Sequence, residues 1–462
     1  MTQDEALVII KTGRNVFLTG DPGSGKTHAV NRFVSWLKEN GVRPAITAST
    51  GIAATHIGGY TIHSWSGIGV SAALTFADLD RIAKNKRIVE RMRSASVLII
   101  DEVSMLSAPV FEMVDAVCRK VRVSSDPFGG MQVVLVGDFF QLPPVISRDS
   151  QKELEGLFEI NNRDKFFAFE SPLWGRLDMI SCYLSEQYRQ EDPLFLEVLS
   201  AIRHGVVLPT HRALLESRFC KNEKPERGIT KLFSHNADVE RVNNEELKKL
   251  FGDESFFRMT SRGSKALISD LTKGCLSPEA LTVKIGAWVM FTKNNFDEGF
   301  VNGTMGIVAG FSKENGYPIV EMRSGRKILA EPSDWIIEEN GRVLASITQV
   351  PLRLAWAITI HKSQGMSLDM AHIDLSRAFE YGQGYVALSR LRTLAGLSLV
   401  GLNNRALEVH PRIKEFDAEL RLLSRSAREE FSNIKDSNID LMHRNFISRC
   451  GGRVSRGDNK LD

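Results

Sequence analysis

The feature that most constrains this chain is a glycine-rich loop near its N-terminus, which runs from Gly20 to Thr27 with the sequence GDPGSGKT. It fits the pattern G-x-x-x-x-G-K-[ST], whose backbone N–H groups surround phosphate oxygens. The apolar stretch 15–19 predicts a strand before the loop, and apolar residues at helical spacing over 27–37 predict a helix after it. A strand, a glycine loop and a helix N-terminus direct amides toward an anion. A glycine-rich turn that matches by accident explains the loop but not its context.

Within this loop, Lys26 is expected to reach the terminal phosphates of a nucleotide, and the Thr27 hydroxyl to hold Mg²⁺. The other loop residues expected to bind the nucleotide are Gly20, Asp21, Pro22, Gly23, Ser24 and Gly25. Asp21 is unusual, because it adds a carboxylate beside bound phosphates. Pointing inward it would weaken nucleotide binding, whereas pointing outward it would have no effect.

A second part of the same site is predicted downstream, where the apolar run 97–100 ends in the carboxylates Asp101 and Glu102. Such a run is typical of a buried parallel strand, which delivers its last residues at the edge where ligands bind. Asp101 is expected to support Mg²⁺ through water, and Glu102 to activate the attacking water as a general base. The alternative is a strand that runs into a solvated turn, but the phosphate loop upstream favours the site.

A third apolar run, 132–136, leads into the sequence GDFFQLPPV, which carries Gln141. Gln141 leaves this strand near the expected γ-phosphate and is a candidate sensor, because its amide both donates and accepts hydrogen bonds. The two prolines that follow are equally consistent with a simple chain stop. Strands that alternate with helical segments predict an α/β fold, with a parallel sheet covered by helices on both faces.

Size and composition narrow the class of protein. A chain of 462 residues is too long for one core, so we expect two large domains. Five cysteines stand singly with no C-x-x-C pair, which argues against zinc and disulfides and for a cytoplasmic or otherwise intracellular setting. No run is long enough to span a membrane, and residues 1–14 lack the apolar core of a signal peptide. Because the net charge is only +3, any nucleic-acid contact requires a local basic groove.

Residues 48–65 are rich in small hydroxyls, glycines and aromatic side chains. Such a surface lets a sugar-phosphate chain approach closely and gives bases something to stack on. Standing alone, this stretch would be read as an ordinary Ser/Thr/Gly loop. Two later segments accompany it, WAITIHKSQGMSLD at 356–369 and YGQGYVALSR at 381–390.

Two arginines, Arg189 and Arg390, lie far in sequence from the phosphate loop. An arginine that completes a nucleotide site from another domain stabilises transition-state charge only when the cleft closes, which would couple hydrolysis to domain movement. A lone arginine after an aromatic residue is ordinarily a surface residue. The ordered set of motifs around these two favours the functional interpretation.

The order of these motifs resembles superfamily-one helicases of the RecD/Pif branch, and most of all the Pif (petite integration frequency) family of DNA helicases. The resemblance extends from Gln3 to about Leu402. The motifs that carry it are TGIAA…GGYTIHS within 50–64, PFGGMQ at 127–132, GDFFQLPPV at 137–145, TIHKSQG at 359–365 and VALSR at 386–390.

The resemblance implies two RecA-like cores, with ATP and Mg²⁺ between them and single-stranded DNA across their tops. It implies that Gln3 reads the adenine, that Gly365 with Gln364 lies close to both ligands, and that Arg189 and Arg390 are arginine fingers. The residues it implies as DNA contacts are Thr50, Gly51, His63 and Ser64 in the first core, and Thr359, His361 and Lys362 in the second. It also implies movement from 5′ to 3′ along the bound strand.

Predicted domain boundaries follow from the motif order. The first core is expected at 1–183, the second at 184–255 and 351–410, and a helical tail at 411–462, with Cys450 and the residues after it loose. Residues 66–95 end in a basic helix, which the resemblance implies is a strand-separating wedge; a solvated helix face explains it nearly as well. Residues 256–350 read as short strands punctuated by Gly and Asn and resemble an inserted SH3-like β-barrel. The five strands expected there are 281–284, 287–291, 305–308, 318–322 and 326–329. Lys293, Asn294, Asn295 and Phe296 are candidate DNA contacts there, or an ordinary hairpin turn.

We therefore expect an ATP-dependent DNA helicase that moves 5′ to 3′ on single-stranded DNA and unwinds duplex, forked or otherwise structured DNA, acting as a monomer away from membranes. One alternative is a DNA-stimulated translocase that displaces proteins without separating strands. Another is a nucleic-acid-binding scaffold that has lost catalysis. The intact set Lys26, Asp101, Glu102 and Gln141 argues against the scaffold, because decay removes some of these residues.

Overall fold

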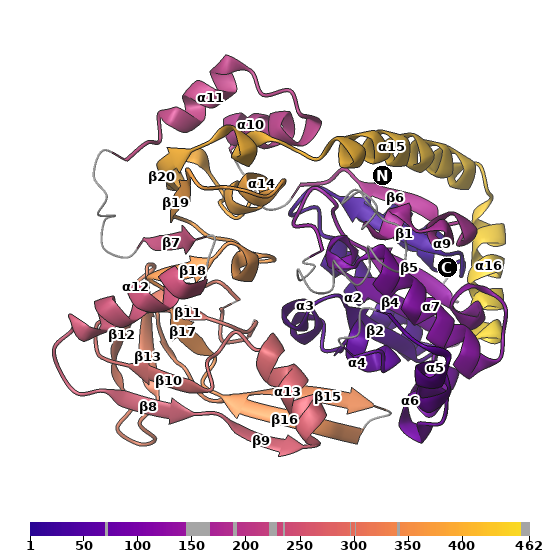
Figure 1. Ribbon diagram of the computed structural model, residues 1–462, viewed down its shortest axis with the longest axis horizontal. Coiled ribbons are helices and arrows are strands. Elements are labelled where there is room, and N and C mark those ends of the chain that lie inside the picture. The colour runs from indigo at the N-terminus through magenta and orange to yellow at the C-terminus, as the bar shows by residue number, and fades with distance from the viewer. Residues whose placement is uncertain are drawn as a thin grey trace, which may run out of the picture. The chain divides into compact units, whose positions relative to one another are not determined.

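The computed structural model describes residues 1–69, 73–144, 167–187, 192–220, 229–233, 236–295, 297–300, 302–339 and 342–453. The chain divides into two compact units (Figure 1). Unit 1 comprises Met1–Phe139, Pro143–Tyr188 and Pro411–Asp462, and unit 2 comprises Phe140–Leu142 and Arg189–His410. The domain boundaries proposed from the sequence stay predictions.

Unit 1 is built on a six-stranded sheet in the order β3-β2-β4-β5-β1-β6, and every pair of neighbours is parallel. Its strands are β1 (Val16–Gly20), β2 (Pro44–Ala48), β3 (Tyr60–Thr61), β4 (Val97–Asp101), β5 (Gln132–Val136) and β6 (Ile180–Leu184). Because all six run the same way, their carboxyl ends meet at one edge of the sheet. That edge receives the phosphate loop after β1 and the two carboxylates at the end of β4.

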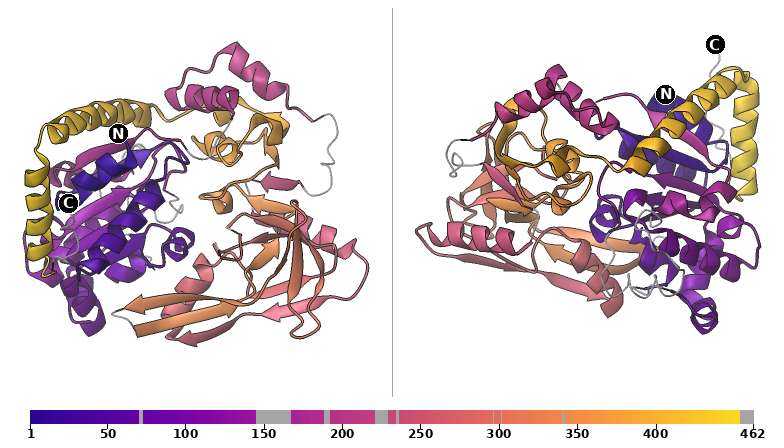
Figure 2. Two further views of the ribbon diagram at one scale, coloured as in Figure 1. Left: turned by 180° about the vertical axis from the view of Figure 1, so that it is seen from behind. Right: turned by 45° about the horizontal axis from the view of Figure 1, so that its top comes forward.

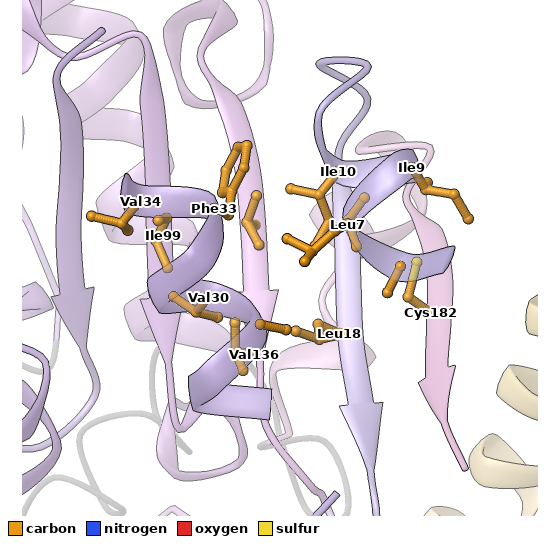
Figure 3. Packing of buried hydrophobic residues seen from close by; sticks show 14 of the residues in the cluster. Leu7, Ile9, Ile10, Leu18, Val30, Phe33, Val34, Ile99, Val136 and Cys182 are labelled. Atoms are coloured by element: carbon orange, nitrogen blue, oxygen red, sulfur yellow. The ribbon is translucent and has the colours of Figure 1, made fainter. Parts of the chain in front are cut away.

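The sheet is buried on both faces, which explains its continuous apolar strands. Every residue of β1, β4 and β5 is buried. Helix α2 (Lys26–Glu39) covers one face with Val30, Phe33 and Val34, which pack with Leu18 and other sheet residues in one core cluster (Figure 3). Burying each such side chain contributes about 1.5–3 kcal/mol, so this face fixes the helix that follows the phosphate loop.

The remaining helices of unit 1 cover the sheet and its ends. They are α1 (Gln3–Ile10), α3 (Gly51–His56), α4 (Ile62–Ser66), α5 (Phe76–Ala83), α6 (Lys86–Ser94), α7 (Ala108–Arg122), α9 (Pro172–Arg176), α15 (Pro411–Ser432) and α16 (Asp436–Arg449), with the 3-10 turns η1 (Val103–Met105), η2 (Pro127–Gly130) and η4 (Ala168–Glu170). Thr2 and Thr75 begin α1 and α5 with capping boxes.

The helices predicted for the C-terminal segment are present and belong to unit 1 (Figure 2). Phe446 and Ile447 of α16 join the same buried cluster as Phe33 of α2. The Ser424 hydroxyl of α15 accepts a hydrogen bond from the Tyr183 backbone N–H, at 2.9 Å. The segment through residue 453 therefore belongs to unit 1. The expectation that the chain is loose from Cys450 onward is wrong for 450–453, because the Gly452 N–H donates to the Ile447 carbonyl at 3.0 Å and the Arg453 N–H to the Asn40 carbonyl at 2.9 Å. Residues 454–462 lie outside the described residues.

The basic helix predicted at the end of 66–95 is α6, and its polar face is only partly solvated. Ile88 and Met92 are buried, while Arg91 donates to the Ser64 carbonyl at 2.5 Å and lies 5.4 Å from the Tyr60 ring. Arg93 donates to the Val121 carbonyl at 3.1 Å. Two of the basic residues thus attach the helix to unit 1.

Unit 2 contains a second parallel sheet, in the order β18-β7-β19-β20. Its strands are β7 (Thr230–Phe233), β18 (Ala357–Thr359), β19 (Ala371–Leu375) and β20 (Leu397–Leu402), and its helices are α10 (Pro193–His204), α11 (Pro209–Glu216), α12 (Asn236–Lys248) and α14 (Gln383–Leu388), with the 3-10 turns η5 (His361–Ser363), η6 (Leu394–Gly396) and η7 (Asn404–Leu407). A parallel sheet in each unit confirms the predicted α/β class.

Unit 2 also contains antiparallel sheets in the region of the predicted β insertion, whose SH3-like character stays a prediction. The strands are β8 (Ser255–Arg258), β9 (Thr260–Gly263), β10 (Ala280–Val283), β11 (Trp288–Phe291), β12 (Met305–Phe311), β13 (Pro318–Met322), β14 (Lys327–Leu329), β15 (Ser333–Glu339), β16 (Arg342–Gln349) and β17 (Leu352–Leu354), with helix α13 (Lys265–Gly274). Five of them form a sheet in the order β14-β13-β12-β11-β17. The five strands expected from the sequence correspond to β10 through β14. The other five strands of this region, β8, β9, β15, β16 and β17, were not predicted. All four residues of β9 are exposed and carry no apolar alternation.

Candidate nucleotide and DNA site

The phosphate loop lies between the end of β1 at Gly20 and the start of α2 at Lys26. The Lys26 ammonium donates to the carbonyls of Gly20 at 2.8 Å and Asp21 at 3.0 Å, so its charge is held over the loop. Gly25 occupies the N-cap with a φ of 83° and offers no side chain to the helix N–H groups. The first turn of α2 therefore presents its amides to an anion.

Two observations test whether the loop fits a bound nucleotide. The Ser24 hydroxyl is buried and has no hydrogen-bond partner among the described residues, which suits a group that receives an external ligand. Gly25 has a φ of 83°, which favours glycine, and a Cβ there would lie 2.1 Å from Nε2 of Gln3 and displace that side chain. Both observations fit a phosphate-binding loop.

Gln3, the residue implied to read adenine, lies beside this loop. Its side-chain amide donates to the Ser24 carbonyl at 3.3 Å, and its backbone N–H donates to Oε2 of Glu186 at 2.7 Å. Its side chain is buried at 8% exposure. The side chain of Gln3 is therefore held against the phosphate loop.

The carboxylate of the unusual Asp21 points toward Tyr183 of β6, which in turn contacts Arg421 of α15. Tyr183 donates its hydroxyl hydrogen to Oδ1 of Asp21 at 3.3 Å, and the same hydroxyl accepts from Nη2 of Arg421 at 2.5 Å. The Arg421 guanidinium also lies 4.2 Å from the Tyr183 ring centre and donates to Asp417 at 2.7 Å. The Arg421 guanidinium of α15 is thereby linked, through the Tyr183 hydroxyl, to the Asp21 carboxylate in the phosphate loop.

Asp101 and Glu102 stand at the same sheet edge, where Asp101 pairs with Ala48 of β2. Burial raises the pKa of Asp101, while the Glu102 N–H, 2.8 Å from Oδ1, and the nearby Lys26 ammonium oppose that rise. Glu102 has a φ of 53°, a conformation that non-glycine residues rarely adopt. The Ser49 hydroxyl donates to the Glu102 carbonyl at 2.6 Å and holds this strained residue.

The DNA contacts implied for the first core lie at the ends of the two neighbouring strands β2 and β3. Thr50 and Gly51 follow β2, and the Thr50 hydroxyl accepts from the Ala53 N–H at 3.2 Å. His63 and Ser64 belong to α4, which follows β3 directly. These four residues are partly exposed. The fold thus brings residues that are more than ten positions apart to one edge.

The DNA contacts implied for the second core follow β18. Thr359 ends that strand, and its hydroxyl accepts from the Lys362 backbone N–H at 3.2 Å. His361 and Lys362 form part of η5 and are partly exposed. Burial, and then the charge of Arg353, lower the pKa of Lys362, and Glu240 opposes this.

The remaining predicted residues belong to unit 2. The side-chain carbonyl of Gln141 accepts from the Gln364 amide at 3.1 Å, and both side chains are buried. Gly365 follows with a φ of 78°. Arg390 is 1% exposed and donates to the Val386 carbonyl at 2.9 Å and to the Ser389 hydroxyl at 2.9 Å. Arg189 and Phe296 lie outside the described residues.

Comparison with known proteins identifies the family. A family model described as PIF1-like helicase matches residues 3–207. An ATP-dependent DNA helicase Pif1 of Psychrobacter sp. is 41% identical over 516 residues, which cover 99% of this chain and 76% of the relative. The chain belongs to the PIF1-like helicase family. Its resemblance to Pif helicases, inferred from the motifs, is thereby confirmed.

Solved structures agree with this membership. A Bacteroides sp. Pif1 in complex with ADP-AlF4 matches with a TM-score of 0.79 and 31% identity, over 91% of this chain and 96% of that one. A Bacteroides Pif1 bound to single-stranded DNA matches with a TM-score of 0.63 and 32% identity, over 92% of this chain and 97% of that one. The PIF1-like fold therefore extends well beyond the residues that the family model matches.

Sequence reasoning missed three features of this PIF1-like chain. One is the Arg421 contact with Tyr183, and another is Arg203 of α10, which is 1% exposed and occupies an apolar helix face. The third is Arg353 of β17, whose Nε is buried without a hydrogen-bond partner among the described residues. Each is an arginine within an ordinary helix or strand pattern, so no local signal distinguishes it.

No described helix combines the length and apolar character needed to cross a membrane. Among the same residues, no group of three or more His, Cys, Asp and Glu side chains is arranged to hold a metal ion.

Proposed function

We propose that this PIF1-like chain is an ATP-dependent DNA helicase, which translocates 5′ to 3′ on single-stranded DNA and unwinds duplex, forked or structured DNA. The observation that carries the proposal is the meeting of the phosphate loop with Asp101 and Glu102 at one edge of a parallel sheet. That edge is where α/β folds bind ligands.

The residues of unit 1 suit ATP hydrolysis. Lys26 and the first-turn amides of α2 would hold the phosphates, and Gln3 would contact the adenine. Thr27 and Asp101 would hold Mg²⁺, which neutralises charge on the phosphate oxygens. Glu102 would accept a proton from the attacking water.

Residues of unit 2 would complete the site and grip the strand. Gln141 would sense the terminal phosphate, and Arg189 and Arg390 would stabilise charge in the transition state. Thr50, Gly51, His63 and Ser64 would contact DNA from unit 1, and Thr359, His361 and Lys362 from unit 2. Two groups of contacts on separate units support stepwise movement, in which each unit grips in turn. The relative bound to single-stranded DNA supports DNA as the ligand, whereas the 5′-to-3′ direction rests on the family resemblance.

The proposal is tested by ATPase assays with and without single-stranded DNA, using Lys26→Ala and the matched control Lys38→Ala on the same helix. Lys38 is exposed and lies a helix length from the loop. We expect DNA to stimulate ATP hydrolysis in the wild type and in Lys38→Ala, and Lys26→Ala to lose hydrolysis while it still binds DNA. A wild-type rate of ATP hydrolysis that does not change when single-stranded DNA is added would overturn the proposal. DNA-stimulated hydrolysis without unwinding of a forked duplex would favour a translocase.

A further inference from the structure

Two consecutive phenylalanines are anchored in different units of the chain. Phe139 belongs to unit 1 and Phe140 to unit 2, although one peptide bond joins them. Phe139 packs within an aromatic cluster of unit 1, with ring centres 4.8 Å from Phe169, 5.8 Å from Phe416 and 5.6 Å from Phe17. The chain returns to unit 1 at Pro143. Residues 140–142 are therefore an arm that leaves β5 and joins unit 2.

Within unit 2, this arm is held by Arg203 of α10 and Tyr385 of α14. The Arg203 guanidinium lies 4.1 Å from the Phe140 ring centre, and its Nη1 donates to the Tyr385 hydroxyl at 3.1 Å. The rings of Phe140 and Tyr385 are 6.4 Å apart. Arg203 is 1% exposed. A charge this deeply buried is costly unless its partners compensate for it, so the contacts with Phe140 and Tyr385 fix its position.

The backbone of unit 2 is also shaped to receive the arm. Gly382, the N-cap of α14, has a φ of 75°, and a Cβ there would lie 2.6 Å from the Phe140 carbonyl oxygen and 2.8 Å from that of Gln141. Any larger residue would push against the backbone of the arm. The next side chain of the arm, Gln141, accepts a hydrogen bond from Gln364 at 3.1 Å.

We propose that Arg203 and Tyr385 are positioning residues, which dock residues 140–142 on unit 2 so that Gln141 moves with Gln364 and not with β5. The peptide between Phe139 and Phe140 is the point at which the chain passes from unit 1 to unit 2. This proposal rests on the proposed function, because it assigns Gln141 the task of reporting a bound nucleotide. It adds which residues transmit that report to the unit that carries Thr359, His361 and Lys362.

The test compares Gly382→Ala with Gly316→Ala. Gly316 has a φ of 73°, and a Cβ there would meet nothing within 4 Å, so both variants carry the same backbone strain but only one disturbs the arm. The measurement is the dissociation constant for single-stranded DNA, with and without a non-hydrolysable ATP analogue. Coupling between two sites typically changes affinity about 5–150-fold, and we expect wild type and Gly316→Ala to fall in that range. We expect the factor for Gly382→Ala to fall to about twofold or less.

Tyr385→Phe provides a milder second variant, because it removes only the hydroxyl that accepts from Arg203. We expect it to reduce the coupling factor while the affinities for nucleotide alone and DNA alone stay within about twofold of wild type. If Arg203 merely filled the core, Tyr385→Phe would change the stability of the protein and leave the coupling factor as in wild type. Coupling equal to wild type in both Gly382→Ala and Tyr385→Phe would overturn the proposal. If the wild-type dissociation constant for single-stranded DNA were the same with and without the ATP analogue, the proposed function would be overturned instead.

Discussion

Replacing Arg421 by leucine should weaken unit 1 and its nucleotide site together. Arg421 makes three contacts: a hydrogen bond to Asp417 at 2.7 Å, another to the Tyr183 hydroxyl at 2.5 Å, and a cation–π contact at 4.2 Å. Hydrogen bonds to charged groups contribute about 1.5–3 kcal/mol each, and cation–π contacts about 0.5–2 kcal/mol. The low ends of these ranges sum to about 3.5 kcal/mol, and because the Arg421 side chain is 33% exposed, solvent screening reduces the expected loss to about 2–3 kcal/mol.

The assay is thermal unfolding of wild type, Arg421→Leu and the control Arg425→Leu. Arg425 lies one turn further along α15 and is exposed, so its replacement should change stability by about 0.5 kcal/mol or less. Each kcal/mol moves the midpoint of a domain of this size by about 2–4 °C, which gives a decrease of about 4–12 °C for Arg421→Leu. Equal midpoints for the two variants would refute the reasoning.

Nucleotide affinity is the second measurement on the same variants. Arg421 offsets the Asp21 carboxylate through the Tyr183 hydroxyl, so its loss leaves more negative charge beside the bound phosphates. A solvent-screened charge contact contributes about 0.2–1 kcal/mol, so we expect the Kd for ATP to rise by up to about fivefold. An unchanged Kd would show that the link from α15 to the phosphate loop carries no electrostatic effect.

Further predictions concern unit 2. Asn243→Ala removes both hydrogen bonds to the Ala357 backbone, at 2.9 and 3.0 Å, and leaves buried groups unpaired, so urea unfolding should show a loss of about 2–3 kcal/mol. Because Lys362 is a proposed DNA contact, Lys362→Gln should reduce the salt dependence of single-stranded DNA binding by about 0.7 in the slope of log K against log salt, whereas Lys362→Arg should keep it. Burial lowers the pKa of His372 below its ordinary 6.5, so the unfolded chain binds its proton more readily. The part of the stability that depends on neutral His372 should be present above pH 6.5 and decline as the pH falls below it, and melts of His372→Gln should lack that decline.

Much of the fold of unit 1 could be predicted because its signals are local. The strands β1, β4 and β5 are continuous buried apolar runs, and a glycine loop or a pair of acids marks the end of two of them. Strand β3, with two residues, and the exposed strand β9 give no comparable signal. Their pairing depends on neighbours that the fold supplies.

The contacts that organise the candidate site could not be predicted, because they join distant parts of the chain. The Arg421 bond to Tyr183 spans 238 residues, and the bond from Arg203 to Tyr385 spans 182. Phe139 and Phe140 are adjacent and identical in type, yet Phe139 belongs to unit 1 and Phe140 to unit 2. Motifs indicate which residues meet a ligand, whereas the residues that hold them in place become visible only in the folded chain.

The central claim is that this chain uses ATP to separate DNA strands while it moves from 5′ to 3′. The most direct measurement is unwinding of two partial duplexes, one with a 5′ single-stranded tail and one with a 3′ tail, in the presence of ATP and Mg²⁺. The account predicts that only the 5′-tailed duplex opens, and that Lys26→Ala opens neither. Opening of the 3′-tailed duplex alone, or strand separation by Lys26→Ala, would contradict it.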